Sequence, residues 1–313
     1  MQHESHLSRR TLLGAAAAGA AAVGTSTVLS SPAQAGSGHG DGPHRVPRDN
    51  ISVQLYTLRN QLEINLEESL AELAEIGYTR VEHAGFVGRT ATQFRAALDN
   101  AGIRATSGHA GIPQPWNADT WKRTLEDAAI VGNKYIVHAF FGLGPNGPVR
   151  DGAVYRAFAD DLNKAGELAR RAGLSFGYHN HHLEFVRQDG GDRTGFDILT
   201  SRTDPRLVHL EVDLYWAWRG AADPVDLIHR HRGRIKQVHV KDMGVDTSAF
   251  TNAPMNDPGA GLIDFGRIFR HAKEAGLVEY IVERDDAGTP PRTPEQALDT
   301  ARVGYEFLEG LRF

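Results

Sequence analysis

The chain has 313 residues, of which 41% are hydrophobic and 23% charged, an ordinary globular composition. Its formal net charge is −5 and its isoelectric point about 6.3, whereas a nucleic-acid-binding domain carries a basic surface and a pI above roughly 9. The absence of cysteine excludes disulfides, thiolate metal sites and a cysteine nucleophile. Nucleic acid is therefore not an expected partner, and a metal ion would need histidine and carboxylate ligands.

Residues 1–35 have the features of an export signal. Arg9 and Arg10 precede an alanine-rich apolar run that reaches Leu29, and the segment ends in a small-x-small cleavage pattern at 33–35. The paired arginines predict the twin-arginine export machinery as a partner and an extracytoplasmic location after cleavage. An uncleaved membrane anchor is the alternative, because the apolar run of about 18 residues is near the lower limit for a span. Residues 36–50, rich in glycine, predict a flexible linker.

From residue 51 onward, short β-branched or aromatic runs alternate with amphipathic stretches, as expected of parallel βαβ units. The expected strands are 51–57, 80–84, 104–109, 135–140, 174–180, 207–213, 235–241 and 279–283. The expected helices are 66–76, 92–101, 118–131, 153–172, 195–201, 224–231, 265–275 and 294–311. Eight such units over residues 51–313 predict an α/β fold, a single-domain (β/α)8 TIM barrel of about 250 residues. A doubly wound open sheet is the alternative, but no glycine-rich phosphate loop follows an early strand.

Alternation along the last four strands places ionisable residues inside the barrel, because every second residue of a barrel strand faces inward. The inward set is His179, Glu211, Asp213, His239, Lys241 and Glu283. Buried charges are costly unless they are paired or bind a metal. We therefore predict one divalent metal ion, Mn²⁺ first, with Zn²⁺, Fe²⁺, Co²⁺ or Mg²⁺ as alternatives. The predicted ligands are His179, Asp213, His239 and Glu283, and ordinary buried salt bridges are the competing interpretation.

Six segments in order along the chain resemble a known family. They are 53–59 (VQLYTLR), 177–185 (GYHNHHLEF), 210–214 (LEVDL), 239–242 (HVKD), 261–265 (GLIDF) and 281–283 (IVE). The chain resembles the sugar phosphate isomerase/epimerase family with a xylose isomerase-like TIM barrel. The resemblance implies one divalent metal bound by Glu, Asp, His and Glu from the fifth to eighth strands. The last three match Asp213, His239 and Glu283, whereas His179 stands where the first glutamate is usual.

This departure affects the expected chemistry. In the epimerases of the family, two metal-bound glutamates lie on opposite faces of the sugar, and only Glu283 of that pair is present here. The predicted catalytic residues are Glu283, Lys241 and His181. Lys241 is the favoured second acid or base, because a nearby metal cation would lower its pKa. The residues expected to contact the substrate are Gln54, Glu82, His109, Glu184 and Trp216. A supporting or purely structural role is the alternative for each of them.

The leading hypothesis is a metal-dependent sugar isomerase or epimerase that moves a proton next to a carbonyl. A non-phosphorylated sugar is favoured, because sugar phosphates are scarce outside the cytoplasm and no phosphate-binding loop is evident. The first alternative is a lyase or hydratase acting on a keto-sugar or keto-glycoside, which the missing glutamate favours somewhat. The second is a non-catalytic extracytoplasmic sugar-binding protein. A homo-oligomer is left open, and a nuclease conflicts with the acidic charge.

Overall fold

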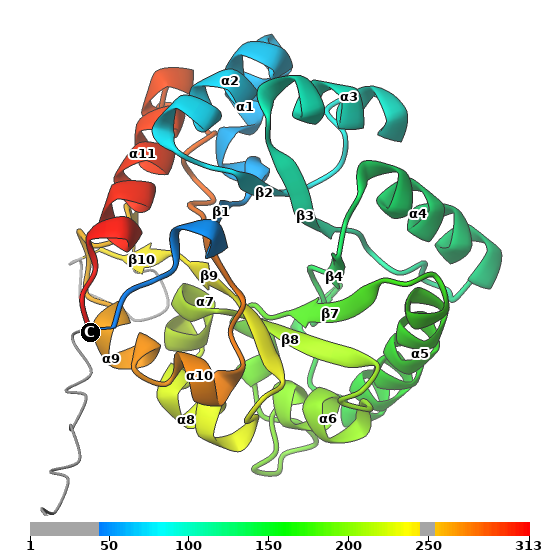
Figure 1. The fold of residues 1–313 in the computed structure, drawn as a ribbon. Helices are drawn as coiled ribbons and strands as arrows, with labels where there is room; N and C mark the ends of the chain where they lie inside the picture. The colour runs from blue at the N-terminus through cyan, green and yellow to red at the C-terminus, as the bar shows by residue number, and fades with distance from the viewer. Residues whose placement is uncertain (1–43, 245–253) are drawn as a thin grey trace, which may run out of the picture. The chain divides into compact units, whose positions relative to one another are not determined.

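The computed structural model describes residues 44–244 and 254–313, so the predicted signal 1–35 and the first part of the predicted linker lie outside the described residues. Eight parallel strands form one sheet in the order β1-β12-β9-β8-β7-β4-β3-β2. Their bounds are β1 (Ile51–Val53), β2 (Arg80–His83), β3 (Arg104–His109), β4 (Tyr135–His138), β7 (Ser175–His179), β8 (Val208–Asp213), β9 (Ile235–Val240) and β12 (Glu279–Val282). A backbone bridge between Gln54 and Glu82 joins the two ends (Figure 1). The predicted single-domain TIM barrel is thereby confirmed.

Helices surround the barrel (Figure 1). They are α1 (Arg59–Ile64), α2 (Leu66–Ile76), α3 (Ala91–Ala101), α4 (Ala118–Val131), α5 (Gly152–Arg171), α6 (Gly195–Arg202), α7 (Leu214–Arg219), α8 (Pro224–Arg230), α9 (Phe265–Phe269), α10 (Ala272–Ala275) and α11 (Pro294–Gly310). Two of them, α1 and α7, were not expected, and the helix expected at 265–275 is divided into α9 and α10. Among the described residues, no helix is long and apolar enough to cross a membrane.

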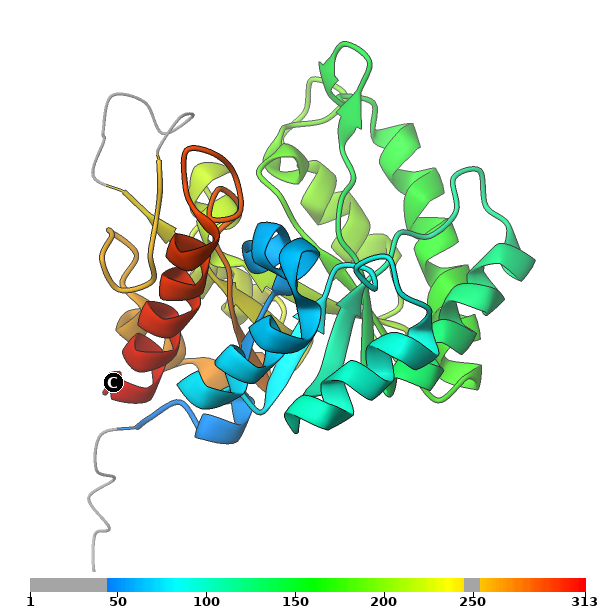
Figure 2. The same ribbon diagram turned by 90° about the horizontal axis from the view of Figure 1, so that it is seen from above.

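The connections that follow the strands carry additional short elements. The pairs β5 (Leu143–Gly144) with β6 (Gly147–Pro148) and β10 (Asp242–Met243) with β11 (Met255–Asn256) are antiparallel. Figure 2 shows the β5–β6 loop, in green, projecting beyond the end of the barrel. The first predicted strand, 51–57, is shorter than expected, because the Gln54 side chain accepts a hydrogen bond from the backbone N–H of Tyr56 and begins a 3-10 turn, Leu55–Leu58.

The described part of the predicted linker is packed against the barrel. His44 and Phe313 exchange backbone hydrogen bonds of 2.9 and 3.1 Å, so the two ends of this domain lie side by side. Val46 is 3% exposed and belongs to the main apolar core. The segment 44–50 therefore differs from the flexible linker expected from its composition. Val46 packs into the apolar core, and composition alone does not predict this contact.

Candidate active site

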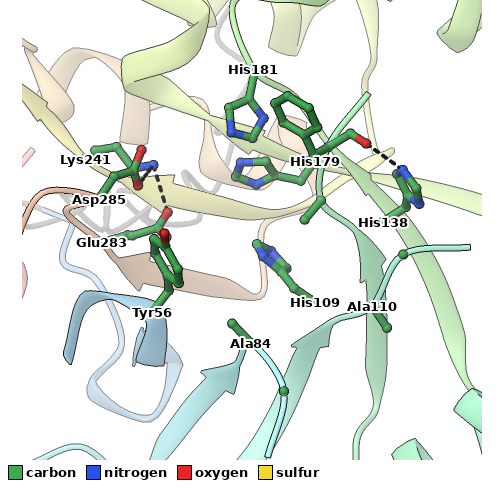
Figure 3. A pocket seen from close by; sticks show the side chains of 14 residues that line it. Tyr56, Ala84, His109, Ala110, His138, His179, His181, Lys241, Glu283 and Asp285 are labelled. Atoms are coloured by element: carbon green, nitrogen blue, oxygen red, sulfur yellow. Dashed lines mark hydrogen bonds and ion pairs between the residues drawn. The ribbon is translucent and has the colours of Figure 1, made fainter. Parts of the chain in front are cut away.

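A cavity of about 700 Å³ opens at the carboxyl ends of the strands, where TIM-barrel enzymes place their active sites (Figure 3). Five of the predicted site residues line it, namely His109, His179, His181, Lys241 and Glu283. Tyr56, His138 and Asp285 also line it and were not predicted. His138 is engaged by the backbone at both ring nitrogens, so it supports the wall of the cavity.

The four predicted metal ligands are brought together beside this cavity, and two of them, His179 and Glu283, line it. The ligand atoms of Asp213, His239 and Glu283 lie within 4.8 Å of one another, and His239 Nδ1 is 2.5 Å from Glu283 Oε2. His179 Nε2 faces Asp213 Oδ2 at 3.8 Å. All four side chains are buried, and together they offer two nitrogen and two oxygen donors, which suits a divalent transition metal or zinc. We call these four residues the ligand cluster.

Lys241 lies beside the ligand cluster, among three carboxylates. Its Nζ is 2.9 Å from Asp213 Oδ2, 2.9 Å from Glu283 Oε2 and 2.6 Å from Asp285 Oδ1. Burial lowers the pKa of Lys241, but the three negative charges outweigh this effect and raise that pKa well above its usual value. The lowered pKa expected from the sequence depends on a bound cation and stays a prediction. Lys241 is an ammonium group, which can donate a proton and can move toward Asp285 when a cation binds Asp213 and Glu283.

A second group of polar side chains lies beneath the ligand cluster. It consists of Glu211, Glu82 and His109, and we call it the deep layer. Glu211 Oε1 is 2.8 Å from His109 Nε2, 3.0 Å from His179 Nδ1 and 3.0 Å from His239 Nε2. The sequence placed Glu211 inside the barrel but assigned it no role. Its position two residues before Asp213 in β8 is the signal that could have found it, because residues i and i+2 of a strand point to the same side.

Glu82 is the other carboxylate of this layer. Its Oε1 accepts a hydrogen bond of 2.7 Å from Gln54 and lies 2.9 Å from His239 Nε2 and 3.1 Å from His109 Nε2. Burial lowers the pKa of His109, but the charges on Glu82 and Glu211 outweigh it and raise that pKa to about 10. Of the residues predicted to bind substrate, His109 lines the cavity, whereas Gln54 and Glu82 are fully buried beneath it and contact the histidines.

Glu184 and Trp216 lie behind the wall of the cavity. Glu184 is fully buried and accepts hydrogen bonds from the Tyr178 hydroxyl and the His181 backbone N–H. The Trp216 ring, on α7, contacts the His181 ring at 5.1 Å between centroids. Lys241 Nζ lies 5.5 Å from the centroid of the Trp216 ring. Neither residue lines the cavity, so both support residues that do. Burial, followed by the charge on Lys241, lowers the pKa of His181 to about 3, which leaves this imidazole neutral.

A second cavity of about 470 Å³ adjoins the first and shares Tyr56, Ala84 and Gly85 with it. Cavities of roughly 300–1,000 Å³ accommodate drug-sized ligands, so the first cavity alone has room for more than one sugar ring. The joined space is therefore compatible with a substrate that carries a group attached to its reacting ring.

Comparisons with known proteins agree with this architecture. The family described as "xylose isomerase-like TIM barrel" matches residues 70–307. An inosose dehydratase from Geobacillus kaustophilus is 28% identical over 280 residues, which covers 78% of this chain and 87% of the relative. A sugar phosphate isomerase/epimerase from Parabacteroides distasonis superposes with a TM-score of 0.68 at 24% identity, covering 84% of this chain and 94% of that one. The zinc-bound IolI protein superposes with a TM-score of 0.63 at 16% identity, covering 84% and 99%. This chain belongs to the xylose isomerase-like TIM barrel family.

Proposed function

We propose that the protein is a metal-dependent lyase that eliminates water, or an alcohol, from a keto-sugar, a keto-cyclitol or a keto-glycoside. This is the first alternative from the sequence, and it now replaces the isomerase or epimerase as the leading hypothesis. Relatives named inosose dehydratase support it, since inosose is a keto-cyclitol and dehydration is an elimination.

The observation that carries the proposal is the unequal distribution of acid and base groups around the cavity. Lys241, Glu283 and Asp285 lie together on one wall, and the histidines line the other (Figure 3). His181 is neutral, and burial lowers the pKa of His179 well below its usual value. His109 Nε2 is directed away from this role, because it contacts Glu211 at 2.8 Å and Glu82 at 3.1 Å. An epimerase needs a proton acceptor and a proton donor on opposite faces of one carbon. An elimination needs one base and one acid, and a single wall can provide both.

The residues of that wall account for each proton in an elimination. A divalent cation bound by the ligand cluster would polarise the substrate carbonyl and make the adjacent C–H more acidic. The Glu283 carboxylate takes this proton, and the electron pair of the C–H bond forms a carbon–carbon double bond. The C–O bond at the next carbon breaks, and Lys241 Nζ donates a proton to the departing oxygen. Glu283 Oε2 and Lys241 Nζ are 2.9 Å apart. The proton that Glu283 takes from carbon can therefore pass to Lys241 and return both groups to their starting protonation states.

The proposal is tested by incubating metal-loaded protein in D₂O with inosose, with keto-glycosides and with free ketoses, followed by NMR and mass spectrometry. We expect loss of one water or alcohol and deuterium at the carbon that loses the oxygen, where the resulting enol takes up a solvent proton, and we expect Glu283→Gln to abolish both. Deuterium exchange or a new epimer without loss of mass would favour the isomerase. Binding without turnover, unaffected by Glu283→Gln, would favour the non-catalytic sugar-binding protein.

We also propose that the chain is exported, on the basis of Arg9, Arg10 and the apolar run that follows them. Cell fractionation of the full chain and of an Arg9→Lys/Arg10→Lys variant tests this. The unchanged chain should accumulate outside the cytoplasm and the variant inside. Equal distribution of the two proteins would refute export by the twin-arginine route.

A further inference from the structure

We propose that Glu211 and Glu82 are positioning residues that hold protons on His179 Nδ1 and His239 Nε2, so that the opposite ring nitrogens face the metal as lone pairs. The inference rests on the metal site of the proposed function and adds two residues to it. It assigns Glu82 a supporting role in place of the substrate contact expected from the sequence.

Each of the two imidazole rings contacts carboxylates through both of its nitrogens. His179 directs Nδ1 to Glu211 Oε1 at 3.0 Å and Nε2 toward Asp213 Oδ2 at 3.8 Å. His239 directs Nε2 to Glu82 Oε1 at 2.9 Å and to Glu211 Oε1 at 3.0 Å. Its Nδ1 faces Glu283 instead. Each ring therefore connects a deep carboxylate to a carboxylate of the ligand cluster.

The chemistry of these contacts determines the tautomer. A carboxylate oxygen accepts a hydrogen bond from a ring nitrogen about 3 Å away that carries the hydrogen. A neutral imidazole has one N–H, and its other nitrogen is then a lone pair. The hydrogen of His179 is on Nδ1, because Nε2 is 3.8 Å from Asp213 Oδ2, beyond hydrogen-bonding distance. His239 contacts carboxylates at both ring nitrogens, and a cation held by Nδ1 and Glu283 would require the lone pair at Nδ1, which leaves the hydrogen on Nε2 for Glu82 and Glu211. A carboxylate behind a metal-bound histidine orients the ring and makes it a stronger ligand.

The deep carboxylates are themselves held rigidly. Glu82 accepts hydrogen bonds from Gln54 Nε2 at 2.7 Å and from Ser107 Oγ at 2.6 Å, and its side chain is fully buried. Glu211 is also fully buried and lies within β8. Rigid strands and fixed rotamers are what a precise metal site requires, because an error of about 1 Å in ligand position weakens it.

His109 is the third member of the deep layer. Its position raises a competing explanation, in which the deep layer holds a second metal ion. Its Nε2 lies between Glu211 at 2.8 Å and Glu82 at 3.1 Å. The ligand atoms of His109, His179, Glu211 and His239 are close enough together to hold an ion of their own. We favour protons over a second ion, since the separations of 2.8–3.1 Å are those of hydrogen bonds and Glu82 is already engaged by neutral donors.

Glu211→Gln and Glu82→Gln test the proposal, because an amide can donate as well as accept and no longer fixes the proton. Glu279→Gln is a matched control. Glu279 is a fully buried glutamate in the same barrel that accepts hydrogen bonds from Gln237 and Thr106 and from neither metal-binding histidine. Two readouts are needed. Imidazole ¹⁵N chemical shifts report the tautomers, and calorimetry with Zn²⁺ reports affinity and stoichiometry.

We expect wild-type protein to bind one Zn²⁺, with His179 protonated at Nδ1 and His239 at Nε2. Each test variant should lose about 10- to 100-fold in Zn²⁺ affinity and show a mixture of tautomers, whereas Glu279→Gln should match wild type. Glu211→Asp, which keeps an acceptor, should recover part of the loss and remain informative if Glu211→Gln does not fold.

Unchanged tautomers and affinity in folded Glu211→Gln and Glu82→Gln would overturn the proposal. So would two bound Zn²⁺ ions in wild type with one lost in His109→Gln, since the deep layer would then be a metal site. Neither readout depends on turnover, so a protein that lacks lyase activity can still meet these expectations, and an active lyase can fail them.

Discussion

Lys241 and a divalent cation have a common set of partners. The Nζ atom lies 2.9 Å from both Asp213 and Glu283, the two carboxylates of the ligand cluster. Asp285, at 2.6 Å, gives the ammonium a partner outside the cluster. Binding of the cation and retention of the proton donor are therefore compatible, provided that Lys241 keeps its contact with Asp285.

Replacement of Lys241 separates its role in proton transfer from its role in charge balance. In Lys241→Met we expect kcat on the identified substrate to fall by about 10²- to 10⁴-fold, the usual effect of losing a general acid. Zn²⁺ affinity should stay equal or increase, because the competing positive charge is gone. Steady-state kinetics and calorimetry measure the two effects, and Lys134→Met, at an exposed lysine directly before β4, is the control. A weaker Zn²⁺ site with unchanged kcat would contradict this assignment.

Glu184 should make the stability of the protein depend on pH. Burial is the main cause that raises the pKa of this carboxyl to about 8, from an ordinary value of 4.5. The folded state therefore keeps a proton that the unfolded state releases, and stability falls as pH rises from about 4.5 to 8. At about 1.4 kcal/mol per pH unit, this window sets an upper limit of about 5 kcal/mol.

Urea unfolding at several pH values between 4.5 and 8 measures this contribution. Because other buried groups titrate as well, the informative quantity is the difference between wild type and Glu184→Gln. We expect the variant to gain stability relative to wild type as the pH increases. A constant difference across the window would show that Glu184 is ionised in the folded protein.

Alternation within strands predicted which side chains point inward, and this local rule located all four members of the ligand cluster. The roles of Glu211 and Asp285 escaped it. Three rings from β3, β7 and β9 meet at one oxygen of Glu211, and such a meeting depends on the relative register of strands that are far apart in sequence. Register between distant strands is a tertiary property, so the residue pattern alone could not provide it.

Among the elements, the junction of β8 and α7 couples the fold to the site through Asp213. Its Oδ1 accepts a hydrogen bond of 2.8 Å from the Trp216 backbone N–H and caps α7, whereas Oδ2 faces Lys241 and His179. One carboxylate thus begins a helix and completes the ligand cluster.

Two substitutions at Asp213 distinguish these functions. Asparagine is as good a cap as aspartate, so Asp213→Asn should keep the cap of α7 and lose most of its Zn²⁺ affinity. Asp213→Ala should lose both, with about 0.5–2 kcal/mol less stability than Asp213→Asn. Urea unfolding and calorimetry report the two properties. Equal stability of the two variants would mean that the cap contributes nothing to the fold.

The eight strands and most of the helices were predictable, because hydrophobic periodicity changes clearly between long segments. The helices α1 and α7 have six residues each, too few to display a helical period, and half of the residues of α7 are aromatic and also suit strands. The break between α9 and α10 was missed for a related reason, since 265–275 keeps its apolar spacing across the break.

For the molecule as a whole, closure of the barrel and formation of the site depend on the same pair of residues. The bridge between Gln54 and Glu82 joins β1 to β2, and their side chains are hydrogen-bonded at 2.7 Å. Because Glu82 also contacts His239, the residue that closes the barrel is in direct contact with the ligand cluster. Closure of the barrel and support of the ligand cluster therefore share Glu82.

The segment that precedes β1 provides a test of the whole domain in solution. Val46 lies in the apolar core and the neighbouring His44 pairs with Phe313, although the composition of 36–50 predicted a flexible linker. Val46→Ala removes two buried methyl groups, and at roughly 0.5–1.5 kcal/mol for each the variant should lose about 1–3 kcal/mol of stability. Val154→Ala, at a position that is 42% exposed on α5, should lose much less and serves as the control. Chemical unfolding of chains that begin at residue 44 measures both variants without the preceding segment. If the two variants prove equally stable, the segment does not pack against the barrel in solution and the linker prediction stands.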